Sequence, residues 1–335
     1  MADQRDKTID LAKTLGIALV VLGHISGQGE GVVLTGIRDF IYQFHVPLFF
    51  FLSGYCFKKN EEWKPFLIKK FRRLYLPFVL WNLVFLVIHV VAHHFAGETA
   101  SVLNTFKHSL KILLGIAVTP LGGATWFLIT LLQALILYKL VLTVFRSAGR
   151  FSKLYVLAIA AVSGVLGSLF ELPFGLEKAF VALAFVCFGH LTKQLSLLQR
   201  VNERFHLPLA LVGMLAVFFI SRFNHPDLAF HQYGIIPVFW LSALVGIFSV
   251  LFLCASISRG RVASFLSEWG QKTIWILIGH FAAFKLVTLI QMACFQLPWD
   301  AIFSHPCNQV GGVWALAYFV AGFFLPLLCS KLFRA

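Results

Sequence analysis

The sequence predicts an all-α integral membrane protein with about ten transmembrane helices and with both termini in the cytoplasm. The 335-residue chain is 59% hydrophobic and only 13% charged, and its mean hydropathy is +0.84. Apolar runs of about 17–25 residues, the length that crosses a hydrocarbon core, recur from one end to the other. The Lys and Arg residues gather in alternate connections between these runs, as they do in multi-pass membrane proteins.

The apolar runs divide the chain into ten expected spans with short connections. Ten spans of about 20 residues use about 200 residues, so a separate soluble catalytic domain does not fit. We therefore expect one transmembrane domain over residues 1–335, with any chemistry between its helices or in its loops. The expected spans are residues 11–28, 40–57, 74–95, 124–145, 154–171, 177–192, 207–221, 233–256, 273–296 and 311–332.

The basic residues set the expected orientation. With the N-terminus inside, the inside connections collect most of the 28 Lys and Arg residues, and an even number of spans returns the C-terminus inside. The membrane topology then accounts for the net charge of +14, and anionic lipid headgroups are the expected partners of these residues. The charge therefore does not indicate binding to nucleic acid. Lys13 interrupts the first apolar run and no small-residue cleavage site follows, so we expect a retained helix rather than a signal peptide.

Three connections also have an expected structure. Residues 58–73 are strongly basic with interleaved aromatic residues, which predicts an amphipathic helix on the inner membrane surface. Residues 110–120 are apolar but too short to cross, so we expect an interfacial or re-entrant segment. Residues 264–272 predict another surface helix. The six cysteines show no CxxC spacing, and a bridge between Cys294 and Cys307 is left open.

The first span carries a lysine and a histidine on one face. Lys13 and His24 are eleven residues apart, so they nearly eclipse each other, about 16 Å apart along the helix axis. Titratable side chains inside a bilayer are costly and usually face a bundle interior or a watery cavity. A functional lysine here would orient an anionic group or Asp10, one turn earlier. In the structural alternative, Lys13 reaches the headgroups and His24 is hydrogen-bonded within the bundle.

Two further histidines lie within expected spans. His45 lies near the outer end of the second span, at a depth similar to His24, and a neutral imidazole can take a proton from a hydroxyl nucleophile. His280 lies in the ninth span, where it either lines the same cavity or is a satisfied core residue. His89 and His93 form an i,i+4 pair, but no Cys, Asp or Glu joins them in that span, so we expect no metal.

The basic segment also contains candidates for binding phosphate. Arg72 and Arg73 lie at the mouth of the third span, and the planar guanidinium binds two oxygens at once. Lys69 and Lys70 precede them. Together they would dock a phosphorylated cytosolic donor. The alternative is that the positive-inside topology alone accounts for these charges.

These residues together resemble the acyltransferase-3 family of integral-membrane O-acyltransferases, and most closely its fucose 4-O-acetylase-like branch. That family's first helix carries Arg, ten residues and His, and Lys13 and His24 stand at that spacing. The motif-bearing segments are 44–55 (FHVPLFFFLSGY), 69–77 (KKFRRLYLP), 126–128 (WFL) and 270–280 (GQKTIWILIGH). Lysine replaces the usual arginine at position 13, which weakens any bidentate contact there.

The resemblance implies that an acyl group, most often acetyl from acetyl-CoA, crosses the membrane to an acceptor hydroxyl outside. It implies that His24 is the base or is transiently acylated, that Lys13 guides the donor, and that His45 orients the acceptor or polarises the thioester carbonyl. Trp126 would stack on a sugar face, and Asp10 and His280 would line the substrate site. The expected partners are acyl-CoA, an extracytoplasmic glycan or lipid-linked sugar, and the lipids of a bacterial inner membrane.

Other classes of function stay open on the sequence alone. Ten helices with intramembrane charge also suit a transporter or flippase for a glycolipid or small solute, although no inverted repeat is visible. A haem protein using His24, His45, His89 or His280 as axial ligands is a second alternative. A membrane scaffold without catalysis is a third. The acceptor, the acyl chain length and the oligomeric state are not readable from the sequence.

Overall fold

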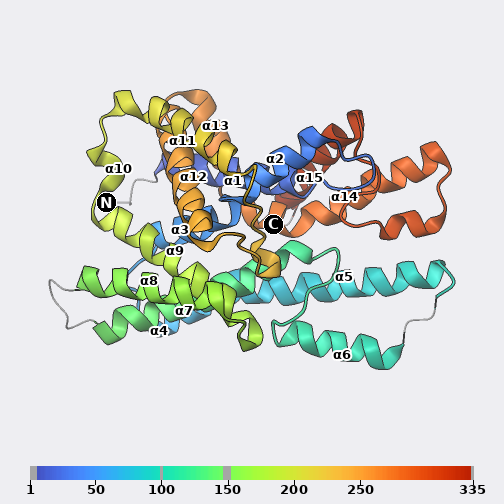
Figure 1. Ribbon diagram of the computed structural model, residues 1–335. Coiled ribbons are helices and arrows are strands. Elements are labelled where there is room, and N and C mark those ends of the chain that lie inside the picture. The colour runs from blue at the N-terminus through green and yellow to red at the C-terminus, as the bar shows by residue number, and fades with distance from the viewer. Residues whose placement is uncertain (1–5, 99–100, 146–151, 333–335) are drawn as a thin grey trace. The chain divides into compact units, whose positions relative to one another are not determined.

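The computed structural model describes residues 6–98, 101–145 and 152–332, and the regular elements in those ranges are all helical (Figure 1). Two isolated β-bridges, Gln28 with Gln309 and Asp227 with Gln232, are the extended pairings found there. The helical elements are α1 (Lys7–Gly23), α2 (Val32–Tyr42), α3 (His45–Tyr55), α4 (Trp63–Lys70), the π-helix η1 (Phe71–Tyr75), α5 (Leu76–Phe95), α6 (Val102–Leu113), η2 (Gly123–Thr125), α7 (Trp126–Val144), α8 (Ser152–Leu169), η5 (Pro173–Gly175), α9 (Leu176–Gln194), α10 (Leu197–Arg200), η6 (Glu203–Phe205), α11 (His206–Ile220), η7 (Leu228–Phe230), α12 (Ile236–Ser256), α13 (Arg261–Trp269), α14 (Thr273–Phe295), η8 (Trp299–Phe303) and α15 (Val313–Leu332).

Seven helical segments within the described ranges are long and apolar enough to cross a membrane. This confirms the predicted all-α integral membrane protein. The number of ten spans and the cytoplasmic position of both termini stay predictions. The seven segments are Trp63–Phe95, Gly123–Val144, Pro173–Gln194, Glu203–Ile220, Ile236–Ser256, Thr273–Phe295 and Val313–Lys331.

Two expected spans differ from the structure. Residues 11–28 do not form one helix, because α1 ends at Gly23 and residues 24–28 follow it as irregular chain. Residues 40–57 do not form one helix, because α2 ends at Tyr42 and α3 begins at His45. The break is held by the buried amide of Gln43, which donates hydrogen bonds to the carbonyls of Asp39 (3.2 Å) and Asn224 (2.5 Å). The same side chain accepts one from Ser242 at 2.9 Å. A count of apolar residues does not detect a break that one polar side chain stabilises.

The basic segment 58–73 also continues further than expected. Rather than a separate surface helix, α4 continues through the π-helix η1 into α5, so Trp63–Phe95 is one helical run. The expected interfacial segment 110–120 begins inside α6, and the expected surface helix 264–272 overlaps α13. Tyr75 of η1 donates a hydrogen bond to the Leu113 carbonyl at 2.6 Å, which ties the end of α6 to the π-helix.

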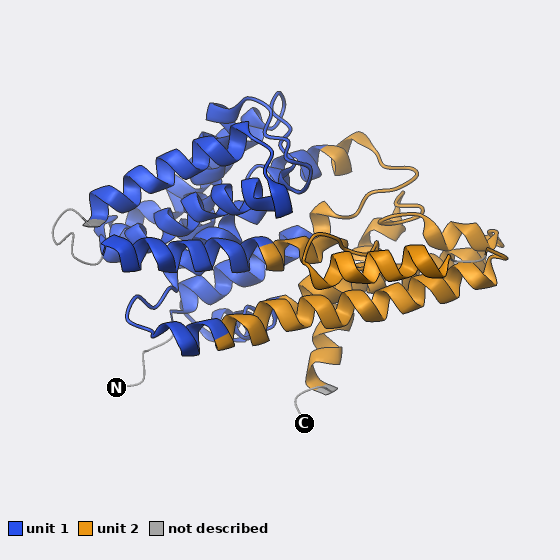
Figure 2. Cartoon of the chain, turned by 90° about the horizontal axis from the view of Figure 1, so that it is seen from below, with its two compact units in different colours: residues 1–20, 36–67, 130–273 blue, residues 21–35, 68–129, 274–335 orange. Residues whose placement is uncertain are grey.

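The chain divides into two compact units (Figure 2). Unit 1 comprises Met1–Val20, Gly36–Leu67 and Thr130–Thr273. Unit 2 comprises Val21–Thr35, Ile68–Ile129 and Ile274–Ala335. Asp10, Lys13 and His45 therefore belong to unit 1. Unit 2 contains His24, His280, Trp126 and the basic residues of η1.

Within unit 1, two glycines let α3 and α9 pack closely. A Cβ at Gly54 would collide with the Val186 carbonyl, and a Cβ at Gly189 would collide with the Phe51 carbonyl. Small residues at such contacts let helix backbones approach, which favours van der Waals packing where no water drives helices together. The α3–α9 contact therefore depends on the absence of two methyl groups.

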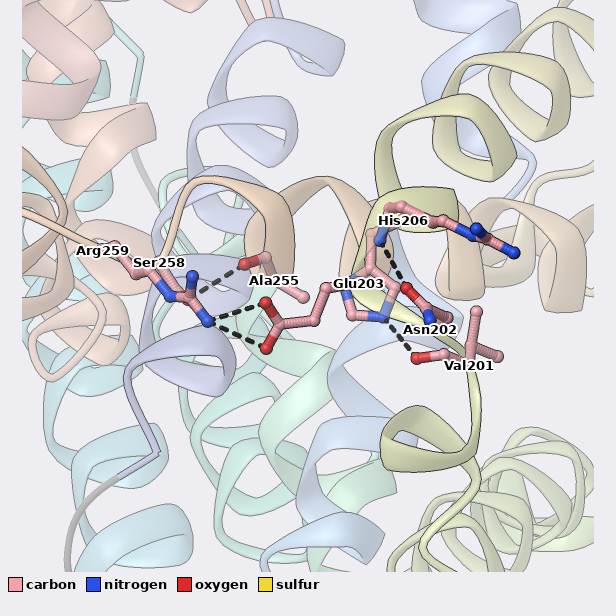
Figure 3. Close-up of polar contacts among 8 residues, drawn as sticks. Val201, Asn202, Glu203, His206, Ala255, Ser258 and Arg259 are labelled. Carbon is pink, nitrogen blue, oxygen red and sulfur yellow. Dashed lines mark hydrogen bonds and ion pairs between the residues drawn. The ribbon is translucent and has the colours of Figure 1, made fainter.

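A buried lysine and an exposed arginine bind loops of unit 1 in different ways. Lys139 of α7 is buried, and its ammonium donates to the backbone carbonyls of Lys59 (3.2 Å) and Glu61. One guanidinium nitrogen of Arg259 donates hydrogen bonds to both carboxylate oxygens of Glu203, at 2.9 and 2.7 Å (Figure 3). Both partners of this second pair are mostly exposed, so it contributes at most about 1 kcal/mol.

Replacing Gly189 with alanine is expected to lower the melting temperature and the yield of folded, detergent-solubilised protein. The added methyl meets backbone rather than a movable side chain, and overpacking of this kind costs about 1–3 kcal/mol. Gly31→Ala is the matched control, because a Cβ there has nothing within 4 Å. Equal melting temperatures for wild type and Gly189→Ala would contradict the packing described.

Candidate functional site

Two histidines meet inside unit 2. His24 follows the last residue of α1, and His280 lies two turns into α14. Their rings stack with centroids 5.1 Å apart and an angle of 28° between the planes. Phe281 contacts both rings, with its centroid 5.0 Å from that of His24 and 4.3 Å from that of His280. The structure therefore brings the two imidazoles together in an aromatic environment.

The hydrogen bond of His280 fixes which nitrogen is basic. Its Nδ1 lies 2.9 Å from the Ile276 carbonyl, and a carbonyl can only accept, so Nδ1 carries the proton in the neutral ring. The opposite nitrogen, Nε2, then carries a lone pair. This nitrogen is buried and has no hydrogen-bond partner in the described part of the chain. A buried acceptor without a partner is unfavourable unless a substrate group satisfies it.

His24 is positioned by a short backbone pairing. The segment after His24 lies beside the segment before α15. The backbone amide of Cys307 donates to the Ser26 carbonyl (3.2 Å), the amide of Gln28 donates to the Asn308 carbonyl (2.7 Å), and the amide of Val310 donates to the Gln28 carbonyl (2.9 Å). A Cβ at Gly27 would collide with the Asn308 carbonyl, so a glycine is required for this approach. We call residues 26–28 and 307–310 the loop pair.

The buried amide of Gln291 holds the loop pair from α14. Its Nε2 donates to the Gln309 carbonyl (2.7 Å), and its Oε1 accepts from the Gln309 amide (3.3 Å) and the Tyr318 hydroxyl (2.9 Å). The same hydroxyl accepts the Asn308 amide at 3.1 Å. Gln291 and Tyr318 are fully buried. Side chains of α14 and α15 thus form hydrogen bonds with backbone groups of the loop pair that no helix or strand pairs.

A second polar network lies on the other side of Phe281. Asn82 of α5 donates to Thr125 (2.8 Å) and accepts the backbone amide of Thr119 (2.9 Å), which fixes the turn before α7. Gly123 in this turn faces the Phe281 ring at a distance that leaves no room for a Cβ. Trp126 begins α7 directly after the turn.

The segment 304–306 also contacts Phe281. The His305 ring lies 5.0 Å from the Phe281 ring, and Lys285 of α14 donates to the carbonyls of Ser304 and Pro306, the second at 3.5 Å. Cys307 follows and is buried. Burial raises the pKa of the Cys307 thiol to about 12, so the sulfur is a neutral thiol rather than a thiolate nucleophile.

The predicted phosphate-binding residues also lie in unit 2. Lys69 and Lys70 end α4, and Arg72 and Arg73 follow in η1, with both guanidinium-bearing residues exposed. Four cations within five residues create a concentrated positive charge. Single π-helical turns inside α-helices often occur at functional sites. The binding of donor phosphates at this end of the helical run stays a prediction.

Three predicted site residues belong to unit 1. Lys13 donates a hydrogen bond to the carboxylate of the buried Asp10 at 3.0 Å, one turn away, as the sequence suggested. An ammonium has three N–H groups, so Lys13 can donate two further hydrogen bonds. His45 is buried, and its Nδ1 donates to the Ile41 carbonyl at 2.9 Å. The roles of these three residues stay predictions.

Two histidines near the end of α5 lie close together but do not form a complete set of metal ligands. The rings of His89 and His93 lie 4.3 Å apart, and His93 Nδ1 lies 2.7 Å from a carboxylate oxygen of Glu98. Among the residues that the structure describes, no group of three His, Cys, Asp or Glu side chains is placed to hold a metal ion.

Sequence reasoning missed the residues that position the histidines. Phe281, Gln291 and Asn82 were not among the candidates. One signal could have found two of them: Asn82 and Gln291 are uncharged amides inside apolar spans, where an unsatisfied polar group costs several kcal/mol. No comparable signal marks Phe281 in a chain with 37 phenylalanines.

Comparisons with known proteins identify a family and one relative. The family model described as an acyltransferase domain, Acyl_transf_3, matches residues 6–331. The nodulation protein NolL of Sinorhizobium fredii (strain NBRC 101917 / NGR234) is 30% identical over 148 residues. The aligned part covers 42% of this chain and 37% of NolL, so the chain matches well under half of that protein. No solved structure matches the chain.

Replacing Gln291 with leucine is expected to destabilise the protein by about 1–3 kcal/mol. The change removes the amide that pairs with Gln309 and leaves buried backbone groups without a partner. The melting temperature in detergent measures it. Ile290→Leu is the matched control, because it places the same side chain at the neighbouring, exposed position. A Gln291→Leu variant as stable as this control would contradict the role given to Gln291.

Alkylation is expected to separate the two cysteines whose bridging the sequence left open. Both are free thiols in the structure, with Cys294 exposed and Cys307 buried and protonated. N-ethylmaleimide should therefore modify Cys294 in the folded protein and Cys307 only after denaturation, as read by peptide mass spectrometry. Modification of neither residue until a reductant is added would indicate a disulfide instead.

Proposed function

The chain belongs to the acyltransferase-3 family and is a multi-pass membrane acyltransferase, and we propose that it moves an acetyl group from cytosolic acetyl-CoA to a sugar hydroxyl outside the membrane. The observation that carries this proposal is the stacked pair of His24 and His280, in which the Nε2 lone pair of His280 stabilises the proton that His24 accepts. Transfer to a hydroxyl needs a neutral base of this kind at physiological pH.

The donor binds through its phosphates at the cytoplasmic end of unit 2. Arg72 and Arg73 are exposed, Lys69 and Lys70 beside them are half-buried, and each guanidinium can bind two phosphate oxygens. The pantetheine arm of the donor, about 15–20 Å long, spans about ten to thirteen residues of α-helix. That arm would carry the thioester toward His24.

The transfer step uses His24 as general base. The imidazole removes the proton from the acceptor hydroxyl as its oxygen attacks the thioester carbonyl. The tetrahedral intermediate collapses, the C–S bond breaks while the new C–O bond remains, and the imidazolium returns the proton to the CoA thiolate. His280 stays neutral, and its stacked ring and Nε2 lone pair stabilise the positive charge that His24 acquires.

The remaining predicted residues have supporting roles in this proposal. Lys13, oriented by Asp10, guides the donor, and His45 orients the acceptor or polarises the thioester carbonyl. Trp126 stacks on a sugar face. The fucose 4-O-acetylase-like branch and the bacterial inner membrane complete the proposal. They are supported by the resemblance of residues 126–128 and by the bacterial source of NolL.

His24→Ala is expected to abolish transfer, because a positioned general base contributes roughly 10²–10⁴-fold to the rate. Membranes containing each variant are incubated with radiolabelled acetyl-CoA, and label is counted in envelope glycans. His280→Ala should reduce the rate less strongly. His94→Ala is the matched control, since His94 is an exposed histidine at the end of α5.

Two results would contradict this proposal. Full transfer by His24→Ala at normal protein levels would show that His24 is not the base. No label in any glycan and no release of CoA with wild type would favour the transporter alternative, for which substrate flux without acyl-CoA is the decisive assay.

A further inference from the structure

A pocket lined by both polar and apolar side chains lies within unit 2, away from the predicted residues. It lies between the outer half of α5 and α6 and has a volume of about 340 Å³. Its lining includes His89, His93, Asn104, Thr105 and His108. Ligand sites usually measure about 300–1,000 Å³, so this pocket suits a small polar molecule of one or two rings.

We propose that the α5–α6 pocket binds a sugar of the acceptor glycan next to the residue that receives the acyl group, an inference that rests on the proposed function. A sugar presents neighbouring hydroxyls that both donate and accept hydrogen bonds. The pocket offers matching groups in a small volume: the carboxylate of Glu98, the Asn104 amide, hydroxyls of Ser101 and Thr105, and the imidazole of His108. Lining atoms of Leu86 and Val90 supply an apolar wall for the C–H face of the ring.

The histidine–carboxylate pair gives the pocket a fixed polar edge. His93 Nδ1 contacts Glu98 at 2.7 Å, and the His93 ring stacks on Phe303 with centroids 4.1 Å apart. A second contact joins the same elements, because Trp299 donates a hydrogen bond to the Ala92 carbonyl at 3.1 Å. The wall of the pocket is therefore held between α5 and η8 before any ligand arrives.

Side-chain contacts connect the pocket to the residues that support the histidine pair. Phe303 contacts the pocket histidine, and His305, two residues later, contacts Phe281, which in turn contacts both His24 and His280. On the other side, Thr119 lines the pocket and is bonded to Asn82, the residue that fixes the turn against Phe281. A sugar in the pocket thus lies beside the elements that hold the proposed base.

The charges of the pocket favour a neutral sugar over other ligands. Glu98 disfavours an anionic ligand such as a phosphate, and in the described ranges no three ligating side chains are arranged around a metal position. The position at the end of α5 also fits the expected topology, in which this end of the span faces outside.

The test uses two variants on α6, Asn104→Ala and His108→Ala. The purified protein is given radiolabelled acetyl-CoA and a base-deacetylated extract of envelope glycan as acceptor. The apparent KM for the extract should rise about tenfold or more, because each variant removes a hydrogen-bonding group. The KM for acetyl-CoA should not change. Lys107→Ala, on the same helix and outside the pocket lining, should match wild type in both constants.

A third variant, Asn104→Trp, fills the pocket and should exclude the acceptor while CoA binding persists. Size-exclusion chromatography confirms that each variant is folded. If folded Asn104→Ala and His108→Ala keep the wild-type KM for the extract, or if Asn104→Trp transfers normally, the pocket is not the acceptor site. Failure of wild type to label the extract would instead overturn the proposed function itself.

Discussion

The site in unit 2 depends on the pairing of two irregular loops inside a membrane protein. Residues 26–28 and 307–310 exchange backbone hydrogen bonds, and Gln291 completes what they leave unpaired. A buried backbone group without a partner costs about 1–3 kcal/mol, so buried irregular chain persists only where other groups pair with it. The loop pair fixes the end of α1, and His24 comes directly after that end. The position of His24, the proposed base, therefore depends on the hydrogen bonds of the loop pair as well as on the geometry of α1.

The same constraint explains the amides and lysines inside the spans. Asn82 forms hydrogen bonds with the turn before α7. Lys139 donates a hydrogen bond to the connection before α4, and Lys285 donates one to the segment before Cys307. The two lysines donate to backbone carbonyls of these connections, whereas Asn82 accepts the backbone amide of Thr119 and donates to the Thr125 hydroxyl. An intramembrane polar residue is often taken as a sign of catalysis or transport. In this chain many of them instead serve the loops, and the loops in turn position the two imidazoles.

The sequence alone predicted the class of the protein and much of its helix order, because apolar runs follow directly from the thickness of a bilayer. It did not predict the break at Gln43, since one buried amide decides it. The contact of His24 with His280 was also out of reach. Counting 1.5 Å per residue from the expected inner ends at 11 and 273 puts His24 about 20 Å and His280 about 10 Å along their helices. Only helix tilt and packing, which composition does not encode, bring such residues together.

The uninterrupted helical run Trp63–Phe95 has a consequence for distance. One continuous element carries the exposed arginines of η1 near its start and His89 and His93 of the α5–α6 pocket near its end. Sixteen residues separate Arg73 from His89, which corresponds to about 24 Å of helix. The length of this helix therefore sets the separation between a donor phosphate bound at η1 and an acceptor sugar bound in the α5–α6 pocket. A pantetheine arm of about 15–20 Å does not cover this separation alone, so the acceptor chain must extend back from the pocket toward His24.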